Sequence, residues 1–392
     1  MKIAIVFEGD VYNPRGEFIA IHNRIKTLKK MGINIDAFVL WPHYGKISNI
    51  LIGDKNGILV KNYSLDAIGY HCIWYDKSIL DTFTHKLFKK STSIEVSRIY
   101  NLIDLSNYDI VSAHSLKSAR IALDNYKKND IPFVVTWHGS SIHSLPFLDK
   151  NWYSQTEEIL KCTFHNFYVS KELQDIANSI ALNKGSVSLN GIDTERFYPY
   201  TNEIIRRVKQ NLSINQTGKN VAFIGNCYPI KNVTYLPYLF NRIKNELSDV
   251  NFFIVGDIDA FKKIFKNVDL TINYLGSLSN EQMPLYYNVF DLVVLPSLKE
   301  GLPMTALESI ACGAYFVGSK VGEIPNVVGD YFSILRDENF DNSFADRCIQ
   351  VLKESPKQIS LDMKYSVHNI VSSELSIMRR IVNKCKRPKT AN

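Results

Sequence analysis

The segment LVVLPSLKEGLPMTALE, residues 292–308, decides the fold class of this chain of 392 residues. Its first four residues, Leu292 to Leu295, are all apolar and have the length of a buried strand. A short turn follows, and Pro303 stands where the first helical residue is expected, because proline fits the first turn of a helix. A strand, a turn and a helix in this order predict the repeating unit of an α/β fold with a parallel sheet.

The same alternation extends over the whole chain and occurs in two blocks. In the first block we expect a helix at 17–31 and strands at 2–7, 33–40, 110–113, 133–136 and 164–169. In the second block we expect helices at 235–246 and 260–266 and strands at 220–225, 251–256, 273–275, 292–295 and 314–318. Continuous apolar strands are typical of parallel sheets that helices cover on both faces. We therefore predict two doubly wound domains joined near Asp193, with a ligand cleft between them at the carboxyl ends of the strands.

The composition is that of a globular protein, with 45% hydrophobic and 22% charged residues. The 46 basic and 39 acidic residues give a net charge of +7, which is spread over both halves of the chain. Because a nucleic-acid binder would gather this excess in one domain, we expect no nucleic acid partner. No apolar run approaches the ~20 residues of a membrane-spanning helix.

The start of the chain, MKIAIVFEG, does not read as a signal peptide, because its apolar stretch stops at Glu8. The six cysteines include no CxxC pair, so the sequence indicates neither a zinc framework nor a disulfide scaffold. We therefore expect a cytoplasmic protein with reduced cysteines.

Two glutamates in the segment 292–308 are candidates for binding a ligand. Glu300 precedes the expected helix and Glu308 lies inside it. The start of a helix presents unpaired backbone N–H groups and a partial positive charge, which suit a phosphate. Glu300 could then accept hydrogen bonds from hydroxyls beside that anion, and Glu308 from a ribose diol. The alternative is that Glu300 only caps the helix and Glu308 is only exposed.

At this point the sequence resembles a known family. Residues 300–308, with SIACG at 309–313 and VGEIP at 321–325, resemble the signature of GT-B glycosyltransferases of family 4. The similar motifs elsewhere are PRGE at 14–17, TWHG at 136–139, SLNGID at 188–193, and FIG at 223–225 with Lys231 and Asn232. The members of this family are retaining enzymes with two Rossmann-like domains that face each other across a cleft.

The resemblance implies a domain organisation and a division of labour. Residues 1–193 would form an acceptor-binding domain and residues 194–371 a nucleotide-sugar-binding domain. A helix near 372–392 would pack back on the first domain, and Asn190 to Asp193 would act as a hinge.

The resemblance also implies the site residues. Lys231 would place its ammonium group on the donor diphosphate, Glu300 would bind donor-sugar hydroxyls, and His138 would face the donor sugar. The donor-binding residues would be Gly16, Asn226, Leu302, Pro303, Met304, Thr305 and Glu308. No cluster of Asp or His residues has ligand spacing, so we expect neither a metal nor a cofactor.

The chain departs from the family pattern at two places. Asn226 stands where members usually carry an arginine, so Lys231, Lys299 or Arg15 would have to supply the missing charge. Glu323 stands where many members carry a second glycine after Gly322.

The function implied is retaining transfer of a hexosyl or N-acetylhexosaminyl group from a UDP- or GDP-sugar. The acceptor would be lipid-linked or saccharide, in bacterial surface polysaccharide (O-antigen or capsule) synthesis. The alternatives are a GT-B-fold epimerase or phosphorylase, and a non-catalytic nucleotide-sugar-binding module. A dehydrogenase is disfavoured, because no strand is followed by GxGxxG.

Two basic clusters suggest a membrane partner. Lys86, Lys89 and Lys90 form the first cluster, and the segment from Arg379 to Lys389 forms the second. We expect them to bind an anionic surface on the inner face of the cytoplasmic membrane, both beside the acceptor entrance if the second returns to the first domain. The alternative is an ordinary solvated surface.

Overall fold

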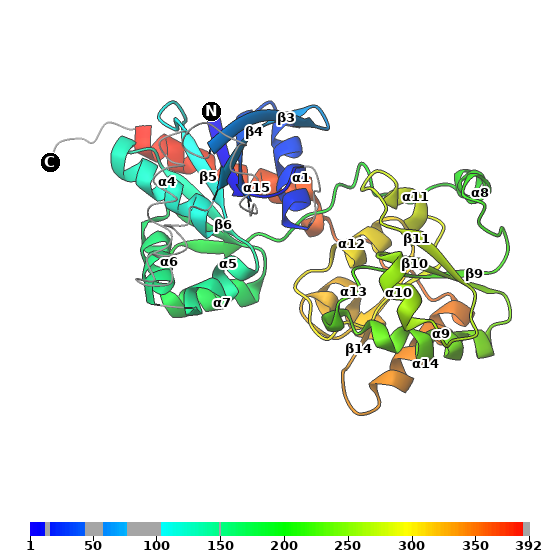
Figure 1. Ribbon diagram of the computed structural model, residues 1–392. Coiled ribbons are helices and arrows are strands. Elements are labelled where there is room, and N and C mark those ends of the chain that lie inside the picture. The colour runs from blue at the N-terminus through cyan, green and yellow to red at the C-terminus, as the bar shows by residue number, and fades with distance from the viewer. Residues whose placement is uncertain (12–15, 44–57, 77–102, 149, 387–392) are drawn as a thin grey trace. The chain divides into compact units, whose positions relative to one another are not determined.

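The computed structural model describes residues 1–11, 16–43, 58–76, 103–148 and 150–386, and the chain divides into two compact units. Unit 1 comprises Met1–Gly191 together with Val367–Asn392, and unit 2 comprises Ile192–Ser366. Each unit is an α/β structure built on its own sheet (Figure 1). The expectation of two Rossmann-like folds is confirmed, and unit 1 is assembled from two separate pieces of the sequence.

The sheet of unit 1 has eight strands in the order β3-β4-β2-β1-β5-β6-β7-β8. All neighbours are parallel except the hairpin pair β3 and β4. The strands are β1 (Lys2–Glu8), β2 (Asn34–His43), β3 (Ile58–Leu65), β4 (Ile68–Asp76), β5 (Ile110–His114), β6 (Phe133–Trp137), β7 (His165–Tyr168) and β8 (Gly185–Val187). The strand order reverses between β1 and β5, which is where ligands bind in folds of this kind.

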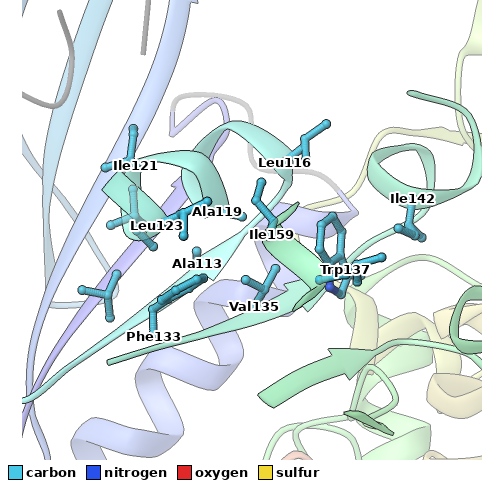
Figure 2. Close-up of a cluster of buried hydrophobic side chains, with 14 of the residues drawn as sticks. Ala113, Leu116, Ala119, Ile121, Leu123, Phe133, Val135, Trp137, Ile142 and Ile159 are labelled. Carbon is cyan, nitrogen blue, oxygen red and sulfur yellow. The ribbon is translucent and has the colours of Figure 1, made fainter. Parts of the chain in front are cut away.

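Helices cover both faces of this sheet. One face carries α4 (Leu116–Asn129), α6 (Lys150–Cys162) and α7 (Lys171–Ile180), and the other carries α1 (Glu17–Lys30) and α15 (Val367–Lys386). Alternate residues of β1 belong to the two different cores, as the two-residue period of a strand requires. Figure 2 shows the first core, in which Phe133 and Val135 from β6 lie beneath α4 and Trp137 lies toward Ile142. The short α5 (Ser140–His143) and the 3-10 helix η2 (Leu145–Phe147) follow β6.

The sheet of unit 2 has six strands, all parallel, in the order β11-β10-β9-β12-β13-β14. The strands are β9 (Lys219–Ile224), β10 (Val250–Val255), β11 (Ile272–Gly276), β12 (Leu292–Leu295), β13 (Tyr315–Ser319) and β14 (Ser333–Ile334). This is the doubly wound order, and its reversal lies between β9 and β12. A ligand of unit 2 is therefore expected at the carboxyl ends of those two strands.

The helices of unit 2 complete its layers. They are α8 (Asn202–Asn211), α9 (Leu236–Glu246), α10 (Ile258–Ile264), α11 (Met283–Tyr287), α12 (Met304–Ala311), α13 (Ile324–Phe332) and α14 (Phe340–Glu354), with 3-10 helices η3 (Pro229–Lys231), η4 (Val233–Tyr235) and η5 (Met363–Tyr365). Among them, α12 starts directly after the loop that ends β12, so its N-terminus belongs to the carboxyl edge of the sheet.

Two of the differences between the structure and the sequence-based expectation concern a hairpin and the start of a helix. The hairpin of β3 and β4 was not predicted, and its turn places Asp66 and Ala67 at positive φ. Pro303 is the N-cap of α12, with ψ of 119°, so the helix begins one residue later than predicted. The extended ψ angle explains the shift, because a helical residue needs a negative ψ.

Candidate functional site

Lys231 and Glu300 meet at the carboxyl edge of the sheet of unit 2. Lys231 ends η3, which follows β9, and Glu300 lies in the loop after β12. The backbone N–H of Leu298 donates to the carbonyl of Ile230 at 2.7 Å, which joins this loop to η3. The Nζ atom of Lys231 then lies 2.6 Å from Oε1 of Glu300. Side chains 69 residues apart in the sequence are therefore brought together at the predicted ligand position.

Gly322 holds the Glu300 loop in place. Its φ is +54°, and a Cβ atom there would lie 2.2 Å from the carbonyl oxygen of Glu300 and 2.5 Å from that of Gly301. The next residue, Glu323, donates its backbone N–H to the Gly301 carbonyl at 2.9 Å. The loop can pack this closely only against a residue without a side chain.

The remaining residues predicted to bind the donor surround this pair within unit 2. Leu302, Met304 and Thr305 are half-buried around the start of α12, where unpaired N–H groups favour an anion. Asn226 is exposed directly after β9, and Lys299 is exposed next to Glu300. Arg15, the other candidate for the missing cation, falls outside the described residues.

Glu308 lies one turn into α12 and is half-buried. Its Oε2 atom accepts a hydrogen bond from the hydroxyl of Tyr287 at 2.7 Å. Burial raises the pKa of Glu308 to about 7, while the Tyr287 hydrogen bond and the charge of Arg196 oppose that rise. This carboxyl group is therefore partly protonated near neutral pH, unlike an exposed glutamate.

Gly16 lies in unit 1, where it is exposed and forms the N-cap of α1 with φ of +47°. The next residue, Glu17, is half-buried. Burial, with a contribution from the charge of Glu8, raises the pKa of Glu17 to about 7. Gly16 is thus at the carboxyl edge of β1, at the point where the strand order of unit 1 reverses.

His138 follows β6 and is 5% exposed. Its Nε2 atom lies 3.1 Å from Nδ1 of His114, the last residue of β5, and the two rings stack with centroids 5.4 Å apart. Burial and the positive charge of Arg24 lower the pKa of His138 to about 3, and burial also lowers the pKa of His114 well below its usual value. Both rings are therefore neutral at physiological pH, and His138 is much less accessible than a sugar-facing residue was expected to be.

A buried ion pair lies close to these histidines in unit 1. Arg24 of α1 and Glu374 of α15 have side chains 3% and 7% exposed, with Nε and Oε1 3.2 Å apart. Arg24 also donates to the carbonyl of Leu189 at 2.9 Å and to Oδ1 of Asn190 at 3.1 Å, and Ser188 donates to Glu374. The two residues before the predicted hinge segment, together with Asn190 at its start, are therefore tied to α1 and α15 within unit 1.

The basic tail lies at the opposite edge of the sheet. Lys386 is paired with Asp109 at 2.6 Å, and Asp109 also accepts from the backbone of Lys2 at 2.7 Å. Both Asp109 and Lys2 lie at the amino ends of their strands. The described end of the tail therefore lies at the amino ends of these strands, its position beside an acceptor entrance stays a prediction, and the cluster at Lys86–Lys90 falls outside the described residues.

Two kinds of site are absent from the described ranges, a metal cluster and a membrane-spanning helix. They contain no group of three or more His, Cys, Asp or Glu side chains placed to hold a metal ion. No helix in the part of the chain that the structure describes combines the length and the apolar character needed to cross a membrane.

Sequence reasoning missed three residues that the structure places beside the predicted ones. They are Arg24, His114 and Tyr287. Arg24 and its partner both read as surface charges of amphipathic helices, and His114 has no motif around it. The only available signal for Tyr287 was its position before the apolar strand that leads to Glu300.

Comparisons with known proteins identify relatives over most of the chain. The family model described as "Glycosyl transferases group 1" matches residues 205–365, and that described as "Glycosyltransferase Family 4" matches residues 74–196. A relative from Escherichia coli, UDP-Gal:alpha-D-GlcNAc-diphosphoundecaprenol alpha-1,3-galactosyltransferase, is 26% identical over 296 residues, which cover 72% of this chain and 76% of that protein.

Solved structures show the same fold. Sucrose-phosphate synthase from Thermosynechococcus elongatus superposes with a TM-score of 0.71 at 14% identity, covering 98% of this chain and 99% of that one. HepE from Anabaena, in complex with UDP and glucose, superposes with a TM-score of 0.64 at 15% identity, covering 97% and 98%. At such low identity these similarities establish the architecture alone.

Proposed function

The chain belongs to the group 1 glycosyltransferases of family 4, and on that premise we propose that it is a retaining enzyme that takes a hexosyl or N-acetylhexosaminyl group from a UDP- or GDP-sugar. The proposed acceptor is a lipid-linked or saccharide intermediate of bacterial surface polysaccharide, O-antigen or capsule. The name of the Escherichia coli relative, which describes a UDP-sugar donor and a diphosphoundecaprenol-linked acceptor, supports this choice. Such an acceptor fits a cytoplasmic protein that binds the inner face of the membrane peripherally.

The observation that carries the proposal is the Lys231–Glu300 pair beside the N-terminus of α12. An ammonium group and unpaired helix N–H groups can neutralise the negative charge that develops on a departing diphosphate. A carboxylate can accept hydrogen bonds from two sugar hydroxyls. Donor binding would replace the Lys231–Glu300 contact by one contact from each residue to the donor, so little charge is left unpaired at any stage.

The proposed chemistry needs no side-chain nucleophile and no metal. The bond between the sugar carbon and the diphosphate oxygen breaks, and the acceptor oxygen bonds to that carbon on the same face. The proton of the acceptor hydroxyl passes to the leaving diphosphate. Catalysis then depends on holding the reactants in position and on neutralising the leaving group.

A non-catalytic nucleotide-sugar-binding module is the second candidate, and Asn226 favours it. An exposed amide stands where the family usually supplies a guanidinium group, so unit 2 has one fixed positive charge fewer for the diphosphate. Such a module would bind the donor and release no nucleotide.

A donor panel separates these possibilities. Incubating the protein with UDP- and GDP-sugars and a diphosphate-lipid-linked sugar should give an acceptor product heavier by one sugar, detected by mass spectrometry. The α-configured donor should give an α-linkage by NMR. Nucleotide binding without product would favour the binding module, and an isomerised or phosphorylated sugar would favour an epimerase or a phosphorylase.

A matched pair of variants connects the activity to the site. Lys231→Ala should abolish most product formation, whereas Lys263→Ala, which removes an exposed lysine of α10, should leave it unchanged. Equal activity in the two variants would contradict the assigned site.

A further inference from the structure

Glu300 and Glu308 are held in different ways. Glu300 contacts a cation, Lys231, at 2.6 Å. Glu308 accepts from a neutral hydroxyl, that of Tyr287, at 2.7 Å. A neutral donor fixes the position of a carboxylate without cancelling its charge, so the second oxygen of Glu308 keeps its full capacity to accept from a ligand.

Tyr287 is itself rigidly placed. It is the last residue of α11, its side chain is 0% exposed, and its ring packs edge-on against Phe197 with centroids 6.1 Å apart. The side chain of Thr305, one helical turn before Glu308, also hydrogen bonds to the Tyr287 hydroxyl. Thr305, Tyr287 and Glu308 therefore form a short hydrogen-bonded chain that runs from the first turn of α12 to the second.

The charged and titratable groups around Glu308 are consistent with Tyr287 as the donor of the hydrogen bond to Glu308. Burial and the nearby Glu308 carboxyl raise the pKa of Tyr287 well above its usual value, so its hydroxyl keeps its proton and can only donate to a carboxylate. Burial also raises the pKa of Cys312 to about 12, so this thiol adds no charge. Arg196 contributes a positive charge from the segment before α8.

We propose that Tyr287 is a positioning residue, which favours the ionised form of Glu308 and orients it so that Glu308 accepts hydrogen bonds from the diol of a ribonucleotide. The inference rests on the proposed function, because it takes the nucleotide of the donor as the ligand of Glu308. In this proposal Tyr287 affects the binding of the ribose of the nucleotide, and not that of the transferred sugar or of the diphosphate.

The sign of the effect follows from proton linkage. A hydrogen bond donated by Tyr287 stabilises the ionised form of Glu308, so it lowers the pKa of that carboxyl. Removing the hydroxyl raises this pKa further above about 7, and more of the carboxyl is protonated at neutral pH. A protonated carboxyl is a poorer acceptor, so diol binding weakens at neutral pH and recovers as the pH rises.

The first experiment measures UDP affinity against pH by calorimetry for the wild type and Tyr287→Phe. The variant keeps the buried ring, and we expect about tenfold weaker binding near neutral pH, which is the loss of one hydrogen bond to a charged group. The midpoint of the pH profile should move to higher pH. The matched control is Tyr286→Phe, because the Tyr286 hydroxyl makes no hydrogen bond in the described part of the chain, and its profile should follow the wild type.

Two further measurements address the diol and the carboxyl directly. An analogue of UDP whose ribose lacks both hydroxyls should bind the wild type and Tyr287→Phe equally. Infrared titration, with Glu308→Gln as the reference that lacks the band, should show the Glu308 carboxyl titrating at higher pH in Tyr287→Phe. Adding Tyr287→Phe to Glu308→Gln should cause no further loss of UDP affinity.

The outcomes separate this inference from the proposed function. An unchanged infrared midpoint, or an unchanged pH profile of UDP affinity, would overturn the role of Tyr287. A shifted infrared midpoint in a wild-type protein that binds no UDP at any pH would instead overturn the nucleotide-sugar function, and the diol role of Glu308 with it.

Discussion

The carboxyl edges of the two sheets share a topology and differ in how they hold charge. In unit 1 the charged pair Arg24–Glu374 is buried and saturated with hydrogen bonds, and the neighbouring histidines are neutral. In unit 2 the side chains of Lys231 and Glu300 are 24% and 9% exposed, and they contact each other at 2.6 Å. The difference teaches that charge at the carboxyl edge of a sheet can serve two ends: unit 1 uses it to fix its own structure, and in the function proposed for unit 2 it would be available for a ligand.

The most severe test of this comparison is Arg24→Met. Removing one member of a buried ion pair leaves Glu374 without a countercharge, which costs about 3–5 kcal/mol of folding free energy. Tryptophan fluorescence during urea unfolding measures this loss in unit 1, because all four tryptophans of the chain lie before Gly191. The double variant Arg24→Met, Glu374→Leu should regain most of the stability, and a double variant as unstable as the single one would show that the pair is not the cause.

In unit 2 the same kind of change should act on the reaction rather than on the fold. Glu300→Ala and Lys231→Ala should each lower turnover by ~10²-fold or more, because in the proposed function each removes a group that would act in the transition state. Thermal unfolding should stay closer to that of the wild type than in Arg24→Met, since the side chains of Lys231 and Glu300 are 24% and 9% exposed, against 3% and 7% for Arg24 and Glu374. Wild-type turnover in either variant would contradict the role proposed for Lys231 and Glu300 in unit 2.

The exposed charges of α15 provide a third test, because they are neither buried nor at a carboxyl edge. Replacing Arg379, Arg380 and Lys384 by Gln should weaken sedimentation with anionic vesicles by up to about a hundredfold, since each cation near such a surface contributes about 1 kcal/mol. Binding should also weaken in high salt, which screens exposed charges. Equal binding of the wild type to neutral vesicles, or no binding to anionic ones, would leave these residues as an ordinary solvated surface.

The smallest effect concerns Glu17, which has a pKa of about 7 like Glu308 but faces the like charge of Glu8. Folding raises the pKa of Glu17 above its usual 4.5, so the protonated form favours the folded state. The contribution of Glu17 to the stability of unit 1 is therefore greatest below pH 4.5 and is lost as the pH rises through 7. Glu17→Gln should therefore stabilise unit 1 by about 1 kcal/mol at alkaline pH, a value reduced because solvent screens the half-buried carboxyl. Below pH 4.5 the variant and the wild type should unfold alike by tryptophan fluorescence, and a gain that persists there would assign the effect to packing instead.

The sequence predicted the layered α/β architecture well, because strands buried on both faces read as unbroken apolar runs. It did not predict the hairpin of β3 and β4, whose strands combine apolar runs with polar residues and pair antiparallel at the sheet edge. A turn with two non-glycine residues at positive φ, Asp66 and Ala67, also carries none of the usual glycine signal.

Prediction of the site was uneven for a physical reason. Lys231 and Glu300 could be nominated because each lies in a recognisable motif after a strand. The Arg24–Glu374 contact spans 350 residues, and no local pattern distinguishes a buried charge from a surface charge on an amphipathic helix. The Tyr287–Glu308 hydrogen bond likewise depends on how α11 packs against α12, which spacing along the chain does not fix.

The divided construction of unit 1 has a consequence for biosynthesis. Residues 192–366 leave the ribosome before α15 does, so unit 2 can complete its fold while one face of the unit 1 sheet still lacks Val371, Leu375 and Met378 of that helix. A nascent or truncated chain therefore exposes an apolar face of the unit 1 sheet, of the kind that chaperones bind, which α15 covers in the full-length chain. The ends of the two pieces nearly touch, since a Cβ at Gly191 would lie 2.5 Å from Cα of Val367, so a gene that joins them through a few residues would encode unit 1 as one uninterrupted polypeptide.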